Sequence, residues 1–397
     1  MKMRLEDICI VFTDGDWIES KDQSDSGIRL VQTGNIGEGT YLEKEARAKY
    51  ISEETFDKLK CTEVFTGDIL VSRLPEPVGR ACIVPEKTER MITAVDCTIC
   101  RPNESLISKE YLCYFMRSNA YYMRLLGNVT GTTRKRISRK NLGNVELRVP
   151  AKDEQKAVVE QLDCLVKVID SRAKELQLLD DLIKARFVEM FGDPQINPYG
   201  WNVVSISEVV GGKVSNGFFA KRDDYCDDGN VSVLGVANIV NRMYSKIDEL
   251  PMTNADTKDI EKFEVKYGDM LFCRSSLVAE GIGKASIIPE NVQANILFEC
   301  HVIRLPLDLS KCVPEFMQTL STMDFFRNQV IAQSKTATMT TIGQGGILKT
   351  DIILPPIEKQ KEFYDFVHQV DKSKVVAQKM QDESQTLFDS LMQEYFG

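Results

Sequence analysis

The 397-residue chain contains little of what most catalytic and metal-binding sites are built from. It has only two histidines, His301 and His368, so a metal centre made mainly of histidine ligands is excluded. A zinc site of the usual pattern needs a second cysteine pair, and Cys97 and Cys100 have none. Residues three apart on a strand point to opposite faces of the sheet. The spacing therefore favours structural cysteines and predicts no metal site.

Motifs for cofactors and catalysis are equally sparse. No Walker A sequence is present, and Gly343-Gln344-Gly345-Gly346 is too weak a match for a cofactor loop. The segment Asn197-Pro198-Tyr199 lacks the second proline of an amino-methyltransferase motif. Glu264-Val265-Lys266 is half of a nuclease signature, but its counterpart Glu63-Val64-Phe65 lacks the lysine. These absences predict a chain that is not an enzyme by itself and that carries no cofactor.

Long hydrophobic runs and an excess of positive charge are also missing. No apolar run approaches the roughly 20 residues of a membrane span, and the start of the chain, Met1 to Asp7, does not resemble a signal peptide. Eleven cysteines without a disulfide pattern indicate reduced thiols and a cytoplasmic protein. The net charge of −9 means that any contact with nucleic acid must come from local patches or from a partner that supplies charge.

What the chain does have is an internal repeat. The stretch from Pro150 to Gly192 aligns without a gap on the stretch from Pro355 to Gly397, and both end in Phe-Gly. A repeat of this length predicts two similar domains, each followed by a similar helix. Weaker matches upstream are Gly67-Asp68-Ile69-Leu70 with Gly268-Asp269-Met270-Leu271, Arg73 with Arg274, and Cys97 and Arg101 with Cys300 and Arg304.

The hydrophobic pattern predicts the elements of each half. Short apolar runs at 28–33, 69–72, 80–84, 91–100 and 145–149 predict strands, and 108–126 predicts a helix. Apolar residues at heptad spacing through 158–190 and 363–391 predict two long helices. We therefore expect a mixed α/β (α+β) fold with two similar globular domains, separated by two long antiparallel coiled-coil helices in a pseudo-twofold arrangement. The expected bounds are 1–149, 150–195 for the central helix, 196–354, and 355–397 for the C-terminal helix.

A cluster of cations and hydroxyls at 132–140 is the strongest candidate for binding. Such side chains suit phosphate oxygens and guanine edges, although a solvated surface loop is the alternative. The counterpart loop at 335–341 keeps the threonines and loses most of the charge. Different chemistry at matched positions fits two domains that read different sequences.

Two further pairs of segments are weaker candidates. Arg73 and Arg274 each follow a strand, where a structural salt bridge is the alternative to DNA contact. The early loops at 14–21 and 216–222 place aromatic residues beside Lys or Arg, which suits contact with bases, but we expect Trp17 and Phe218 to pack in the core. The candidate DNA-binding residues are Lys21, Arg73, Thr132, Thr133, Arg134, Lys135, Arg136, Arg139, Lys140, Lys221, Arg222, Arg274, Ser275, Lys335, Thr336, Thr338 and Thr340.

This organisation resembles the specificity subunit of type I restriction–modification systems. The resemblance covers the whole chain and depends on the order of duplicated motifs. These are the junctions Leu147-Arg148-Val149-Pro150 through Gln155-Lys156 and Ile353-Leu354-Pro355-Pro356 through Gln360-Lys361, the two Gly-Asp turns and the two Phe-Gly helix ends.

The resemblance implies a non-catalytic subunit with two target-recognition domains, which bind the two halves of a bipartite site in double-stranded DNA. It implies two modification subunits as partners, which bind S-adenosylmethionine and methylate adenine, and restriction subunits that use ATP and Mg²⁺. It also implies that the long helices fix the spacing of the half-sites. The alternative is a twin-domain protein–protein adaptor without DNA binding.

The repeat predicts that the two domains are exchangeable. Replacing residues 1–149 with the corresponding domain of a homologue is expected to change one half of the methylated DNA sequence and to leave the other half unchanged. Methylome sequencing of a host that carries the hybrid and its partners measures this. A change in both halves, or loss of methylation by a folded and assembled hybrid, would contradict the modular interpretation.

Overall fold

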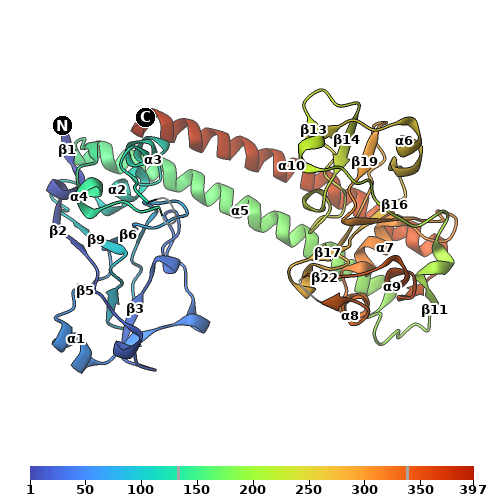
Figure 1. Cartoon of the computed structure of the whole chain (residues 1–397), viewed down its shortest axis with the longest axis horizontal. Coiled ribbons are helices and arrows are strands. Elements are labelled where there is room, and N and C mark those ends of the chain that lie inside the picture. The colour runs from blue at the N-terminus through green and yellow to red at the C-terminus, as the bar shows by residue number, and fades with distance from the viewer. Residues whose placement is uncertain (132–134, 337–338) are drawn as a thin grey trace. The chain divides into compact units, whose positions relative to one another are not determined.

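A computed structural model describes residues 1–131, 135–336 and 339–397. The chain forms two compact units (Figure 1). Unit 1 comprises Met1–Ala173 with Lys379–Gly397, and unit 2 comprises Lys174–Gln378. Each unit combines short strands with helices, which confirms the predicted mixed α/β class with two domains.

Unit 1 is built on two four-stranded sheets, with strand orders β2-β9-β6-β7 and β4-β3-β8-β5, and a two-stranded sheet β1-β10. Its strands are β1 (Lys2–Arg4), β2 (Cys9–Asp14), β3 (Ile28–Val31), β4 (Tyr50–Ile51), β5 (Glu63–Val64), β6 (Ile69–Ser72), β7 (Ala81–Ile83), β8 (Met91–Thr93), β9 (Cys97–Pro102) and β10 (Glu146–Arg148). Its short helices are α1 (Glu53–Leu59), α2 (Lys109–Phe115), α3 (Asn119–Leu126) and α4 (Arg139–Gly143).

Unit 2 repeats the first sheet, with strand order β12-β20-β16-β18, and the two-stranded pair, β11-β23. Its second sheet, β13-β15-β14-β19, shares the parallel pair with unit 1 but has β13 added at one edge and ends at β19, where unit 1 adds β5. Its strands are β11 (Asn202–Ser205), β12 (Ser215–Asn216), β13 (Tyr225–Cys226), β14 (Val231–Leu234), β15 (Met252–Thr253), β16 (Asp269–Cys273), β17 (Ser275–Ser276), β18 (Ala285–Ile287), β19 (Ile296–Phe298), β20 (Val302–Pro306), β21 (Lys335–Thr336), β22 (Thr340–Thr341) and β23 (Asp351–Leu354). Its short helices are α6 (Thr257–Phe263), α7 (Pro314–Ser321), α8 (Asp324–Ala332) and α9 (Gln344–Leu348). Among the strands of the described residues, one pair in each unit is parallel, β3–β8 or β14–β19, and the other strand pairs are antiparallel.

The first sheet of each unit is buried on both faces. In unit 1, Ile69 and Val71 of β6 pack toward the helices α2 and α3, whereas Leu70 packs toward the second sheet. This alternation follows from the two-residue period of a strand. Cys97 and Cys100 of β9 also lie in different clusters on opposite faces, as the sequence predicts. Figure 1 shows α2 and α3 beside the long helices and β3, β5 and α1 farther from them within unit 1.

Two predicted elements are divided in the structure. The helix expected at 108–126 is two helices, because the Ser118 hydroxyl accepts a hydrogen bond from Tyr121 N and donates one to Phe115 O. A serine in this role is an N-cap, which starts a new helix. The strand expected at 91–100 is interrupted by a turn in which Cys97 N donates to Ala94 O at 2.8 Å.

The register of β20 differs from the sequence alignment by two residues. Arg101 donates to both oxygens of Asp68, at 2.7 and 2.8 Å, but the strand pairing places Arg304 opposite Leu271 instead of Asp269. The predicted match of Arg101 with Arg304 is therefore wrong in register, although a two-residue shift keeps both side chains on the same face. Burial raises the pKa of Asp269 to about 6.

The two predicted long helices are α5 (Lys152–Phe191) and α10 (Ile357–Phe396). Each begins in one unit and ends in the other. Inside unit 1 the start of α5 lies beside the end of α10, where the Tyr395 hydroxyl donates to Gln161. Inside unit 2 the end of α5 lies beside the start of α10, where Lys374 Nζ is 2.6 Å from Asp180 Oδ1. Both pairs are antiparallel.

The ends of these helices complete the two cores. In unit 2 the ring of Phe191 packs against Phe316 and Phe363, with centroids 5.0 and 5.6 Å away. In unit 1 the ring of Phe396 packs against Tyr111 at 5.2 Å. Such aromatic contacts add about 0.5–1.5 kcal/mol each beyond the burial of their surface. The repeated Phe-Gly ends are therefore core residues followed by a helix stop, and Gly192 has the positive φ of +76° that this stop requires.

A buried glutamine fixes the junction between the last strand and the long helix in each unit. Gln155 donates to Leu106 O and Pro150 O and accepts from Ser108 N, at 2.8 to 3.0 Å. Gln360 makes the equivalent three hydrogen bonds, to Lys311 O, Pro355 O and Val313 N, at 2.8 to 3.2 Å. The presence of glutamine at this position in both copies of the repeat is thus explained by three backbone groups that an amide of this length can satisfy together.

We expect Gln360→Leu to destabilise unit 2 by about 3 kcal/mol, because three buried backbone groups lose their partners. The measurement is urea unfolding followed by the fluorescence of Trp201, whose indole donates to Phe191 O inside unit 2 at 2.9 Å, in a Trp17→Phe background. The control is Lys361→Leu at the neighbouring exposed position, for which we expect a change within about 0.5 kcal/mol. Equal effects of both substitutions would contradict the assignment.

Candidate nucleic-acid interface

In unit 1 the structure brings the candidate segments together. Ile137 N donates to Arg73 O at 3.2 Å, which joins the cationic loop to the end of β6. Asp14 at the end of β2 lies between the two, with Oδ2 3.2 Å from Arg73 Nη2 and 4.0 Å from Arg139 Nη1. Arg136 Nη2 is 3.0 Å from Asp96 Oδ1. Residues far apart in the sequence therefore form one charged site at one edge of the first sheet.

Arg73 has a different position from the other cations of this site. Its side chain is only 5% exposed, and burial lowers the pKa of its guanidinium, an effect that Asp14 opposes. It also donates to Val95 O. These contacts agree with the alternative of a structural ion pair, and they position Asp14. The sequence does not indicate that Asp14 and Asp96 form ion pairs with Arg73 and Arg136, because these residues approach one another only in the folded chain.

The other candidates of unit 1 are mostly at the surface. Lys135, Arg139 and Lys140 are exposed and Arg136 is half-buried. Lys21 is exposed and lies 2.7 Å from Glu19. Thr132, Thr133 and Arg134 lie outside the described residues, so their predicted contacts stay predictions.

In unit 2 the equivalent segments form a small sheet of their own. β17, which follows Arg274, pairs with β22, and β22 pairs with β21. Ser275 lies opposite Thr341, and the hydroxyls of Thr336 and Thr340 are 3.0 Å apart. The ribbon therefore presents hydroxyl groups where unit 1 presents guanidinium groups.

The exposure of the candidates in unit 2 varies. Lys335, Thr336, Lys221 and Arg222 are exposed. Arg274 and Ser275 are half-buried, and Arg274 donates to Cys300 O at 3.2 Å. Thr340 is buried, and Thr338 lies outside the described residues. The backbone segments that form the candidate site are thus equivalent in the two units, whereas their exposed side chains differ.

The early loops only partly agree with the sequence. Phe218 is packed as expected, with its ring 6.0 Å from that of Phe263. Trp17 is not in the core: it is 69% exposed, so the expected packing is wrong for this residue. The residue after Phe218, Phe219, is 68% exposed. The hydrophobic pattern alone cannot separate these positions, because both loops are short and have no regular period.

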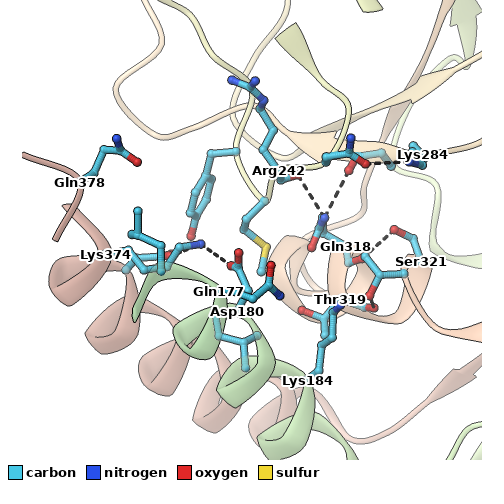
Figure 2. A pocket seen from close by; sticks show the side chains of 18 of the residues that line it. Gln177, Asp180, Lys184, Arg242, Lys284, Gln318, Thr319, Ser321, Lys374 and Gln378 are labelled. Atoms are coloured by element: carbon cyan, nitrogen blue, oxygen red, sulfur yellow. Dashed lines mark hydrogen bonds and ion pairs between the residues drawn. The ribbon is translucent and has the colours of Figure 1, made fainter. Parts of the chain in front are cut away.

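Unit 2 also contains a cavity of about 780 Å³. It is lined by α5, α10, α7 and the loop around Tyr244, and Figure 2 shows Lys374 and Asp180 directed toward each other at its base. Gln318 donates to Arg242 O and Ala285 O, both at 3.2 Å. Beside the cavity Tyr244 OH is 3.1 Å from Glu315 Oε1, and burial raises the pKa of Glu315 to about 7.

The cavity exists because small side chains replace large ones. At the equivalent place in unit 1 the guanidinium of Arg117 lies over the rings of Tyr114 and Phe388, at 5.1 and 5.5 Å. The repeat places Thr322 and Ile183 of unit 2 at the positions of Arg117 and Phe388. The cavity is therefore a difference between the units and does not belong to the repeated site.

Two negative findings concern the described part of the chain. Across 1–131, 135–336 and 339–397, His, Cys, Asp and Glu do not gather in any group of three or more that could hold a metal ion. None of the described helices combines the length and apolar character that crossing a membrane requires. All eleven cysteines are free.

Comparison with known families identifies the chain. The model of the type I restriction modification DNA specificity domain matches residues 1–180 and again residues 198–383. The chain therefore belongs to this family, which confirms the resemblance that the sequence motifs indicate. The two matches also correspond to the two halves of the repeat.

Individual relatives are distant. The chain is 24% identical over 315 residues to the type I restriction enzyme StySPI specificity subunit of Salmonella potsdam, which covers 75% of this chain and 65% of the relative. It is 23% identical over 288 residues to the EcoKI specificity subunit of Escherichia coli strain K12, which covers 69% and 61%. The matched region thus spans less than two thirds of the length of each of these relatives.

Solved structures support the fold. A chain from a study of complex assembly and conformational transition of the type I restriction–modification system aligns with a TM-score of 0.54 at 16% identity, covering 100% of this chain and 97% of that chain. The S subunit of the type I system from M. genitalium aligns with a TM-score of 0.53 at 12% identity, covering 100% and 96%. At this identity the likeness concerns the fold alone.

The contacts of Arg73 and Lys140 predict opposite effects of substitution. Arg73→Ala leaves Asp14 without its nearest cation and is expected to destabilise unit 1 by about 2–4 kcal/mol. Lys140→Ala removes an exposed cation and should change stability by less than about 0.5 kcal/mol, while reducing the salt dependence of DNA binding by about one counterion. Chemical unfolding and fluorescence anisotropy at several salt concentrations measure the two effects. An Arg73→Ala variant as stable as the unmodified chain would exclude the structural assignment.

Proposed function

We propose that this chain is the DNA-specificity subunit of a type I restriction–modification enzyme. It binds a bipartite site in double-stranded DNA, and each unit reads one half. The chain itself is non-catalytic: two modification subunits bound to it use S-adenosylmethionine to methylate adenine, and restriction subunits use ATP and Mg²⁺. Such a complex works in the cytoplasm.

One observation carries the proposal: the two units share a frame and differ in exposed chemistry at the same edge. Unit 1 presents Lys135, Arg139 and Lys140 there, whereas unit 2 presents Lys335 and Thr336 beside its hydroxyl-rich ribbon. Base edges in the major groove are distinguished by patterns of donors and acceptors. Two domains with different donors on one frame suit two different half-sequences.

The surface of the long helices supports a role for protein partners. Several large apolar side chains on them remain exposed, among them Leu178 and Val375 in unit 2 and Leu387 in unit 1, each at least half exposed. Leu178 and Leu182 on α5, and Val376 and Met380 on α10, are exposed pairs one helical turn apart, and neighbouring exposed apolar side chains suit a protein contact. The helices are also acidic, which suits contact with basic partners that contribute positive charge near the DNA.

The decisive experiment is the assembly of the full chain with its modification subunits and the sequencing of methylated DNA from a host that carries them. We expect one bipartite motif with a fixed spacer and an affinity for a duplex containing that motif at least 10³-fold above that for other DNA. Binding is measured by fluorescence anisotropy at near-physiological salt, since affinities depend strongly on salt.

The adaptor hypothesis predicts a different result. A twin-domain adaptor would assemble with proteins and show no preference for any duplex. Stable assembly without sequence preference, at both low and physiological salt, would exclude the specificity function and favour the adaptor.

A further inference from the structure

Two exposed aromatic side chains remain after the candidate site is described. Trp17 in unit 1 and Phe219 in unit 2 are 69% and 68% exposed. A single exposed aromatic residue is common and needs no explanation. Two exposed aromatic residues on two domains of different sequence do require an explanation if they occupy the same structural position.

The glycine before each ring shows that the positions are the same. A Cβ on Gly15 would lie 2.3 Å from Thr93 O, and a Cβ on Gly217 would lie 2.2 Å from Glu299 O. Both glycines are therefore pressed against the end of the second sheet, at a distance that only glycine allows. The residue after each glycine forms an isolated parallel bridge, Asp16 with Ala94 and Phe218 with Glu299.

The turn after each ring gives an independent marker. Glu19 N donates to Asp22 Oδ2 at 3.1 Å, and Lys221 N donates to Asp224 Oδ2 at 2.7 Å. In both units this capped turn starts two residues after the ring. Trp17 and Phe219 are thus equivalent by the glycine two residues before them, by the bridge that the intervening residue forms and by the capped turn after them.

The neighbouring position shows that the ring is not kept for packing. Asp16 accepts a hydrogen bond from Thr62 N at 2.9 Å, whereas its equivalent Phe218 packs on Phe263. The inward residue therefore changed from a carboxylate to a phenyl ring, while the outward residue stayed a large aromatic one. A side chain exposed to water is not stabilised by burial in the core, so packing does not explain the aromatic residue at this position.

Other exposed rings in the described chain have partners. The guanidinium of Arg101 lies 4.6 Å from the ring of Phe65, and Tyr199 packs on Trp201 at 5.9 Å. No ring or cation partner is found for the faces of Trp17 and Phe219 among the described residues. Their flat faces are available to a ligand that is itself flat.

Both rings adjoin the candidate DNA-binding segments. In unit 1, Asp14 beside Gly15 pairs with Arg73 and approaches Arg139. In unit 2, Asn216 beside Gly217 is 3.2 Å from Gln344, at the start of α9 just after the hydroxyl-rich ribbon. Each ring therefore follows, by three residues, a side chain that contacts or lies just beyond the cations or hydroxyls that suit a phosphate backbone, and it adds a flat apolar surface that suits a base.

We propose that Trp17 and Phe219 are DNA-contacting residues, one for each half-site, whose rings stack on a nucleobase at a base step that they open. The inference rests on the proposed function and names the contact that each unit makes. Apolar side chains inserted between base pairs partly unstack them. Stacking of a base on an aromatic ring offsets this and tolerates any base. The rings therefore position each unit, and the neighbouring polar groups supply the sequence preference.

The first test uses the full chain assembled with its modification subunits and a fluorescein-labelled duplex that contains the methylated motif. We expect Trp17→Ala and Phe219→Ala each to weaken binding by about 10- to 100-fold, and Trp17→Phe to restore most of the affinity. The matched control is Ile196→Ala, an apolar residue that is equally exposed but lies outside both loops. We expect no change for this variant.

The second test locates the contact. 2-Aminopurine is placed at successive positions of the duplex other than the methylated adenine, and its fluorescence changes where the base exchanges a neighbouring base for an aromatic ring or loses its stacking partner. We expect Trp17→Ala to abolish such a change in one half-site only, and Phe219→Ala to abolish it in the other. In a Trp201→Phe background, the emission of Trp17 should fall on binding.

The outcomes separate the two proposals. If the duplex binds the Trp17→Ala and Phe219→Ala variants as tightly as the unmodified chain, and Trp17 emission is unchanged, the stacking contact is excluded and the specificity function stands. If the unmodified assembly shows no preference for the motif duplex, the specificity function fails, and the stacking contact fails with it.

Discussion

The burial of helix ends inside the two cores is the constraint on which the rest of the structure depends. In unit 2 Phe191 of α5 meets both Phe316 of α7 and Phe363 of α10, and in unit 1 Phe396 meets Tyr111. A two-sheet domain without these rings would have an open hydrophobic face beneath α2 or α7. Each unit therefore needs a segment of both helices to complete its core, and the helices need the units to bury a single apolar stripe.

The same physical logic separates what is repeated from what varies. Gln155 and Gln360 satisfy equivalent backbone groups at the junction of strand and helix, and no shorter or apolar side chain replaces them there. At the exposed edge no such requirement applies, and unit 1 has guanidinium groups at positions where unit 2 has hydroxyl groups. Internal hydrogen bonds thus require the same residues in both units, whereas the exposed edge leaves room for different side chains.

The sequence predicted the larger features well because they depend on periodicity. The heptad spacing located α5 and α10, and the strand at 69–72 matches β6 to the residue. The sequence-based prediction was wrong where a single side chain determines the local structure. Ser118 starts a new helix through its hydroxyl, and the two-residue shift of Arg304 depends on sheet pairing that a linear alignment does not contain.

The candidate site was predictable in its segments but not in its contacts. The cationic loop and the end of β6 do meet, yet their partners come from elsewhere in the chain: Asp14 from the end of β2 and Asp96 from the turn before β9. Trp17 was expected in the core because large aromatic residues usually bury most of their surface. In the folded loop Gly15 packs against the carbonyl group of Thr93, Asp16 faces inward and Trp17 faces outward, an arrangement that no local sequence pattern encodes.

The division of α10 between the units has a consequence for biosynthesis. Unit 1 includes residues 379–397, which the ribosome translates only after the whole of unit 2. The first domain to be synthesised therefore leaves the ribosome with an incomplete core, which lacks Phe388, Met392 and Phe396 until the end of the chain is made. The second domain has all of its parts earlier. In a growing chain unit 2 can therefore complete its core before unit 1 does, which is the reverse of the order in which the two are synthesised.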